Sequence, residues 1–150
     1  MKKILFLFAF CVGAFGADVE INDIYARASI AGVPNSAVFM NITNKENKVI
    51  KLISASSLAS KKAELHTHVK ENEMMKMLKV ENFEIAPNAT LELSPGGNHI
   101  MLLGLKNELK ASDKIELKLY FDDNSSVELK GVEVKDLKNS MKNSANHPHH

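Results

Sequence analysis

Hydrophobic and polar residues alternate along much of the chain with the period of two that is typical of half-buried β-strands. The alternation is plainest at 115–121 (IELKLYF) and 127–130 (VELK). Turn-forming residues separate such segments, as at 95–97 (PGG). The segments that we predict as strands are 19–29, 37–43, 49–56, 63–69, 74–80, 90–93, 99–105, 114–121 and 127–134. Many short strands at this spacing predict an all-β protein, built as an antiparallel sandwich or barrel.

Residues 1–16 have the order of features typical of a secretory signal peptide. Two lysines precede an apolar stretch at 4–12, and 14–16 (AFG) supplies a small-x-small cleavage site before Ala17. The apolar stretch is too short to span a bilayer as a helix. Cys11 follows Phe10, where a small residue would precede a lipid-bearing cysteine, so lipid attachment is disfavoured. The sequence therefore predicts a periplasmic protein without stable membrane insertion.

Removal of this leader also removes Cys11, which is the single cysteine of the chain. The mature protein then has no disulfide and no thiolate nucleophile. Its lysines and glutamates are interspersed, and the whole chain has a net charge of only +1, so the basic stripe of a nucleic-acid-binding protein is missing. The sequence also lacks G-x-S-x-G, H-E-x-x-H and a Gly-rich phosphate loop. We therefore expect a protein that is not an enzyme.

Four residues with metal-binding side chains follow the spacing H-x10-M-x21-H-x-M, namely His66, Met77, His99 and Met101. A thioether is soft and uncharged, and it favours Cu(I) over calcium, magnesium or zinc. In a chain with 6 His and 7 Met among 150 residues, chance would give these offsets on the order of once in a thousand such sequences. The pattern predicts a Cu(I) site. A blue-copper electron carrier is disfavoured, because it requires a thiolate ligand.

The predicted strands explain how these ligands could meet. Side chains two residues apart on a strand share a face, so His99 and Met101 lie together. If 63–69 and 74–80 pair as a hairpin across 70–73, Met77 comes close to the strand of His66. We therefore expect the four side chains to converge at one end of the scaffold. Glu64, on the face of His66, is expected to be solvated.

The ligand segments 63–77 (AELHTHVKENEMMKM) and 93–106 (LSPGGNHIMLLGLK) resemble the periplasmic copper chaperone family known as PCuAC. The resemblance extends more loosely to 25–29 and 35–44. It implies a cupredoxin-like, immunoglobulin-like β-sandwich, here over 17–135, with the four motif residues as ligands. It also implies delivery of Cu(I) by ligand exchange to a respiratory oxidase copper centre. A thioredoxin-like copper chaperone is a further implied partner.

The chain departs from the family at one ligand position. Many members have Met directly after the first His of the motif, where this chain has Thr67. Met74 and Met75 are both candidate replacements. His68 shares the face of His66, and three roles remain open for it: an additional ligand, a partner that orients His66, or an exposed polar residue of the strand.

Residues 136–150 lose the alternating pattern and predict a mobile tail. The tail contains His147, His149 and His150. Because imidazole-rich tracts bind Cu(II), the tail is a candidate for a second, weaker Cu(II) site, with incidental histidines as the alternative.

Two other functions remain open for the chain. One is copper sequestration for tolerance, without a dedicated recipient, and the other is a periplasmic binding or adhesion sandwich with structural Met and His. A store would hold several copper ions, a chaperone one or two, and an adhesion domain none.

Overall fold

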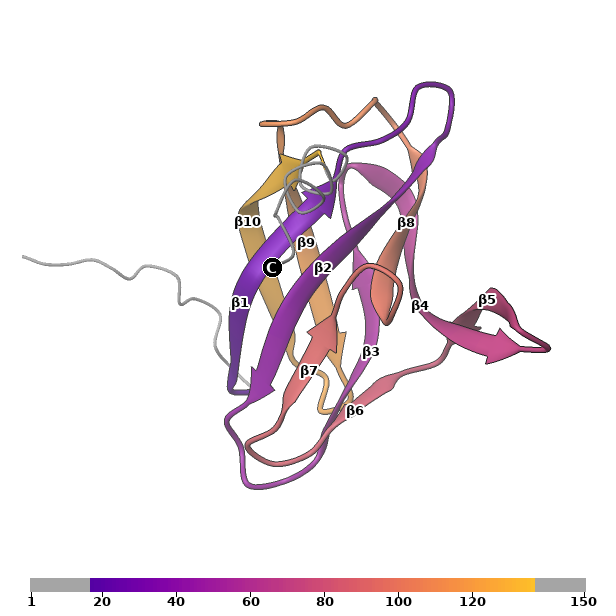
Figure 1. Cartoon of the computed structure of the whole chain (residues 1–150). Helices are drawn as coiled ribbons and strands as arrows, with labels where there is room; N and C mark the ends of the chain where they lie inside the picture. Colours follow the sequence, from indigo (N-terminus) through magenta and orange to yellow (C-terminus); the bar gives the residue numbers. More distant parts are fainter. Residues whose placement is uncertain (1–16, 137–150) are drawn as a thin grey trace, which may run out of the picture.

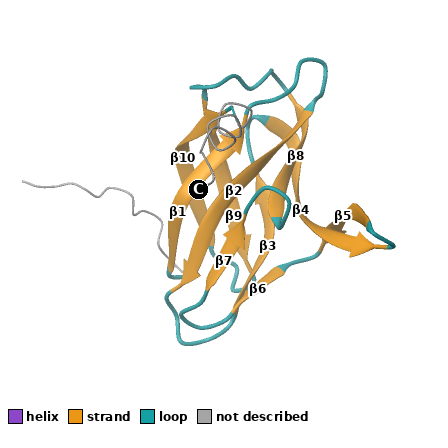
Figure 2. Ribbon diagram, in the orientation of Figure 1, coloured by secondary structure: helices purple, strands orange, loops and turns teal. Residues whose placement is uncertain are grey.

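The computed structural model describes residues 17–136, which form β-strands joined by turns and contain no helix (Figures 1 and 2). The strands are β1 (Val19–Arg27), β2 (Asn35–Asn44), β3 (Ile50–Ser56), β4 (Ser60–Glu71), β5 (Met74–Val80), β6 (Phe83–Ile85), β7 (Thr90–Leu93), β8 (His99–Leu105), β9 (Lys114–Phe121) and β10 (Ser126–Lys135). Every strand predicted from the alternation is present. The short strand β6 was not predicted. No segment of 17–136 is a helix long and apolar enough to cross a membrane.

The strands form two sheets joined at one edge. The first sheet has the order β5-β4-β8-β2-β1, with β7 also paired to β2, and the second has the order β10-β9-β3-β6. All pairings within the sheets are antiparallel. The sheets meet where β1 pairs with β10 in parallel, with Ala26 beside Val134. The predicted all-β sandwich is confirmed, and the parallel pair is an addition to it.

The core lies between the two sheets and takes alternate residues from each strand. Side chains less than 2 % exposed include Val38, Met40 and Ile42 from β2, Ile100 and Leu102 from β8, and Leu117, Leu119 and Phe121 from β9. On β2 and β8 these are the even-numbered positions. The odd-numbered positions of both strands therefore face away from the core, on the outer face of the first sheet.

A buried asparagine at the end of β2 makes hydrogen bonds to the second sheet. Asn44 is fully buried, and its side-chain amide donates to the carbonyl oxygens of Ile85 on β6 (2.9 Å), Lys48 (2.8 Å) and Ala86 (3.2 Å). Its Oδ1 accepts from the backbone N–H of Glu46 at 2.8 Å. One side chain thus makes hydrogen bonds to four backbone groups at this end of the sandwich.

The hairpin of β4 and β5 extends beyond the sandwich (Figure 1). Glu71 pairs directly with Met74, so Asn72 and Glu73 form a two-residue turn, and both have positive φ (52° and 66°), as in a type I′ turn. Up to His66, β4 also pairs with β8, and beyond it β4 pairs only with β5. We call residues 67–79 the arm.

Candidate metal centre

The pairing of β4 with β8 brings two of the motif residues side by side. His66 lies directly across from His99, and Glu64 lies across from Met101. Directly paired residues in antiparallel strands share a face. His66, His99 and Met101 therefore lie together on the outer face of the first sheet, opposite the core.

The pairing of β4 with β5 adds the fourth motif residue to this face. Met77 lies across from His68, which is two residues from His66 on the same strand. Met75 lies across from Lys70, again on the same face. The structure thus places all four motif residues, together with His68 and Met75, on one face of three adjacent strands. Thr67 lies on the opposite face of β4, where its Oγ1 donates to Asn98 Oδ1 at 2.7 Å.

The imidazole rings are spaced closely enough to share a metal ion. The ring centroids of His66 and His99 are 5.7 Å apart. Two imidazoles bound to one ion at about 2 Å with a tetrahedral angle have centroids roughly 5 Å apart. Among residues 17–136, no three His, Cys, Asp or Glu side chains are grouped so that they could hold a metal by themselves. The sulfur atoms of Met77 and Met101 are further donors on this face.

The backbone carbonyl of Gly97 fixes the tautomers of two histidines. It lies 3.0 Å from Nδ1 of His99 and 3.2 Å from Nδ1 of His68. Because a carbonyl oxygen can only accept, each Nδ1 must donate its hydrogen to it. In the neutral form of each ring, Nε2 then has the lone pair that a metal ion requires.

Glu64 fixes the tautomer of His66 in the opposite sense. Its carboxylate accepts from Nε2 of His66 at 2.9 Å, and this hydrogen bond, helped by Lys62 and Lys79, lowers the pKa of Glu64. Nδ1 of His66 then has the lone pair, and this atom is buried without a hydrogen-bond partner within residues 17–136. An unpaired buried polar atom is costly, and a metal ion beside His99 would satisfy it. The expectation that Glu64 is simply solvated was wrong.

Burial keeps His99 in its neutral form. His99 is 3 % exposed, and its ring centroid lies 6.3 Å from that of Phe39, which in turn makes a tilted ring contact with Tyr25. Burial lowers the pKa of His99, as do the charges of His68, His66 and Arg27, while the hydrogen bond to Gly97 opposes them. The unprotonated ring that binds metals is therefore the stable form at neutral pH.

This lowered pKa predicts a pH dependence of folding. Histidine in the unfolded chain takes up a proton near ~6.5, whereas folded His99 resists protonation, so the unfolded state binds more protons below that pH. The free energy of unfolding of the metal-free protein should fall as the pH drops through ~6.5, by at most about 1.4 kcal/mol per pH unit for this one group. Urea unfolding between pH 5 and 8 measures it. His99→Gln should flatten the profile, and parallel profiles for the two proteins would contradict the assignment.

Several sequence-based predictions concern residues outside 17–136. The signal peptide of 1–16 and the tail histidines His147, His149 and His150 lie outside the described residues. Of the groups that the structure adds to the site, Glu64 was visible as a polar residue on the ligand face. The Gly97 carbonyl had no signal in the sequence beyond its place in a turn before His99.

Comparison with known proteins places the chain in a family. The family model described as "Putative lipoprotein LpqE-like" matches residues 19–134. "Putative lipoprotein Lxx21020" from Leifsonia xyli is 33 % identical over 126 residues, covering 83 % of this chain and 74 % of that protein. The solution structure of apo-DR1885 from Deinococcus radiodurans matches with a TM-score of 0.63 and 27 % identity over 89 % of each chain.

The copper-bound PCuAC domain from PmoF2 matches with a TM-score of 0.67 over 81 % of this chain and 97 % of that domain. Its identity to this chain is 17 %, so it bears on the fold alone. The fold of residues 17–136 is that of PCuAC domains, as the ligand segments predicted. The chain belongs to the LpqE-like family.

Proposed function

We propose that this protein is an exported Cu(I) chaperone that holds one copper ion with His66, Met77, His99 and Met101. The observation that carries the proposal is the buried Nδ1 of His66, which has no hydrogen-bond partner among residues 17–136 and lies on the same face as His99 and two thioethers. A relative supports the choice of metal. The solution structure of CuI-DR1885 is 28 % identical to this chain, with a TM-score of 0.60 over 77 % of this chain and 76 % of that one.

The donor set suits Cu(I) in charge and in softness. Two neutral imidazoles and two thioethers add nothing to the +1 charge of the ion, and the Glu64 carboxylate hydrogen-bonded to His66 offsets that charge on a half-buried face. His99 and Met101 are buried, whereas Met77 on the arm is exposed. The inner half of the site is thus shielded from water and the outer half is open. An incoming ligand from another protein can reach the ion from this open side, next to Met77.

Transfer of this kind breaks no substrate bond and moves no electron. Copper remains Cu(I), and each metal–ligand bond that breaks is replaced by one to the acceptor. The recipient that we propose is the copper centre of a respiratory oxidase, reached directly or through a thioredoxin-like copper chaperone. The periplasm is the proposed compartment. One relative and the family model are named as putative lipoproteins, which supports export, as does the leader-like sequence of 1–16.

Anaerobic titration with Cu(I), followed by X-ray absorption at the copper edge, tests this function on the chain from Ala17 to His150. We expect one tightly held Cu(I) with both nitrogen and sulfur scatterers. Copper with nitrogen and oxygen scatterers only would contradict the proposal. Binding of several Cu(I) ions would favour sequestration, and no binding would favour an adhesion domain. The same chain ending at Lys142 is the control: it should keep the Cu(I) site and lose any Cu(II) bound by the tail histidines.

A further inference from the structure

The arm carries potential copper ligands that are not part of the spacing motif. His68 lies across from Met77, and Met75 is the next residue of β5 on the same face. Cross-strand neighbours of this kind have Cβ atoms about 5 Å apart, within reach of a shared ion. The imidazole of His68 and the thioethers of Met75 and Met77 therefore lie together on the arm, on the same face of the strands as His66.

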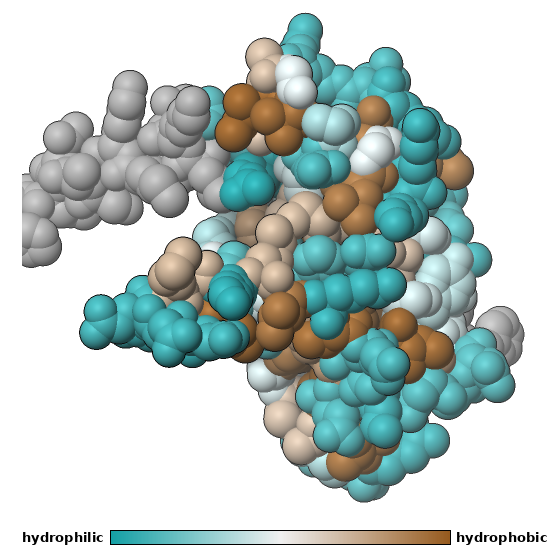
Figure 3. All heavy atoms as spheres, turned by 90° about the vertical axis from the view of Figure 1, so that its right-hand side faces the viewer, coloured by the Kyte–Doolittle hydropathy of each residue, from teal (hydrophilic) through white to brown (hydrophobic). Residues whose placement is uncertain are grey.

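These thioethers differ from Met101 in their exposure to solvent. Met75 is 59 % exposed and Met77 46 % exposed, against 8 % for Met101 and 3 % for His99. A methionine that fills a core would be buried. In Figure 3 the arm projects from the body of the molecule, with hydrophilic residues at its tip. The potential ligands on this face thus form two groups. The inner group is His66, His99 and Met101, and the outer group is His68, Met75 and Met77. Met77 belongs to the four-residue motif as well as to the outer group.

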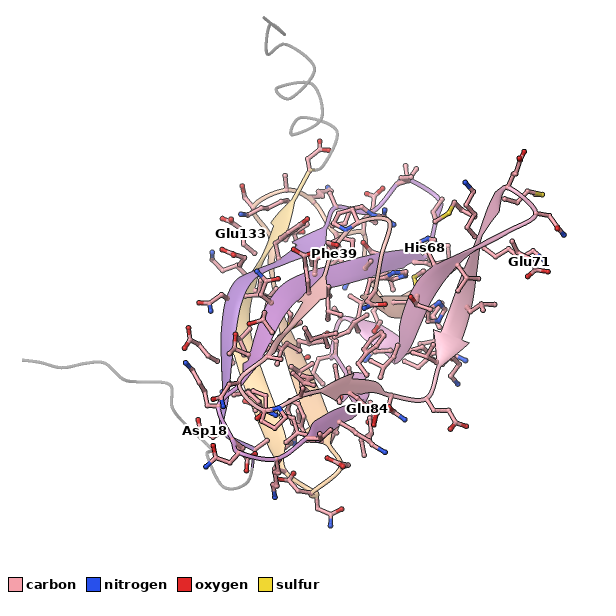
Figure 4. All side chains as sticks on the ribbon, turned by 60° about the horizontal axis from the view of Figure 1, so that its bottom comes forward. Asp18, Phe39, His68, Glu71, Glu84 and Glu133 are labelled. Atoms are coloured by element: carbon pink, nitrogen blue, oxygen red, sulfur yellow. The ribbon has the colours of Figure 1, made fainter. Side chains whose placement is uncertain are left out.

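His68 connects the two groups. Figure 4 shows it between Phe39 on the sandwich and Glu71 near the tip of the arm. Its ring centroid lies 5.3 Å from that of His99, and its Nδ1 donates to the Gly97 carbonyl. Its Nε2 therefore has a free lone pair close to the inner group.

We propose that His68, Met75 and Met77 form an outer copper position through which Cu(I) enters and leaves the inner position at His66, His99 and Met101. The proposal rests on the Cu(I) chaperone function. In the outward step the Met77 thioether stays bound while a bond to His68 Nε2 forms and a bond to His99 Nε2 breaks. A bond to the Met75 sulfur then replaces those to Met101 and His66. Copper remains Cu(I), and no proton or electron moves, because every donor is a neutral lone pair.

The charge around the outer position favours a monovalent ion. All three donors are uncharged, and Lys70 lies directly across from Met75. Neutral donors add no negative charge that would stabilise a divalent cation. Thioether donors select Cu(I) further. The outer position therefore suits the same ion as the inner one, held by fewer donors and more weakly.

The arm supplies a matched pair of variants for a test. Met74 and Met75 are neighbours on β5, are exposed to a similar extent (65 % and 59 %), and point to opposite faces of the strand. Met75→Leu removes a sulfur from the site face, and Met74→Leu removes one from the other face. His68→Gln removes the imidazole of the outer position.

The measurements are the Cu(I) affinity, by competition with bicinchoninate, and the rate of Cu(I) transfer to excess bicinchoninate, by stopped flow. For Met75→Leu and His68→Gln we expect an affinity within about threefold of the original and a transfer rate lower by about tenfold or more. Met74→Leu should change neither quantity. A selective loss of rate distinguishes an outer position from a structural role, since misfolding would also lower the affinity.

Equal transfer rates for Met74→Leu, Met75→Leu and the unmodified protein would overturn the outer position. If Met101→Leu still lost affinity in that case, the proposed function would stand without it. If the unmodified protein bound no Cu(I), the proposed function itself would fail. A large loss of affinity in Met75→Leu would also overturn the inference, because Met75 would then be a ligand of the resting site.

Discussion

Replacing Met101 with leucine is expected to lower the affinity for Cu(I) by about 100-fold while leaving the fold intact. Leucine has nearly the volume and hydrophobicity of methionine, so the change should cost less than about 1.5 kcal/mol of stability. Only the sulfur is lost. Met101 lies across from Glu64 and two residues from His99, on the shielded side of the site, so no exposed donor can take its place.

Met40→Leu is the matched control for this experiment. Met40 is 1 % exposed and lies in the core between the sheets, on the opposite face of the first sheet from the site. Its replacement makes the same chemical change without removing a ligand. Competition with a Cu(I) chelator should show weakened binding in Met101→Leu alone. Equal affinities in the two variants would assign Met101 to packing and exclude it from the ligand set.

Replacing Asn44 with alanine should destabilise the protein by about 3 kcal/mol, the largest loss that we expect from a polar residue here. The substitution removes the hydrogen bonds of the Lys48 and Ile85 carbonyl oxygens and of the Glu46 N–H, around a side chain that is itself fully buried, while the Ala86 carbonyl still accepts from the N–H of Ala89. Each buried group left unpaired costs on the order of 1 kcal/mol or more. Urea unfolding monitored by circular dichroism measures the change.

Asn41→Ala provides the comparison for this second prediction. Asn41 lies on the same strand, and its side chain makes one exposed hydrogen bond of 3.3 Å to Asp23. Water can replace that bond, so we expect a loss below about 0.5 kcal/mol. Similar losses for the two variants would mean that Asn44 does not secure β6 to the end of β2.

The alternation of side chains predicted most of the strands because each buries one face, and a buried face leaves a period of two in the sequence. The alternation did not reveal the strand Phe83–Ile85, since three residues are too few to show a period. It also could not show that β1 pairs with β10 in parallel. Alternation reports which face of a strand is buried and contains no information on the direction of its neighbour.

For the candidate site, only features that depend on a single strand could be predicted from the sequence. The spacing of His99 and Met101 fixes their common face from the geometry of one strand alone. The pairing of His66 with His99 depends on the register between β4 and β8, which the sequence does not encode locally. The roles of Glu64 and of the Gly97 carbonyl follow from that register and from the turn before β8, so neither role could be predicted from the sequence.

The parallel contact between β1 and β10 has a consequence for the order in which the molecule can be assembled. Ala26, near the start of the described chain, pairs with Val134, near its end. A ribosome or a secretion channel delivers the polypeptide from its amino end, so β1 emerges first and the strand beside it emerges last. The seam between the two sheets therefore cannot close until the domain is completely released. Folding into the final sandwich is expected to be a late, post-synthetic event, during which β1 has β2 as its only neighbour.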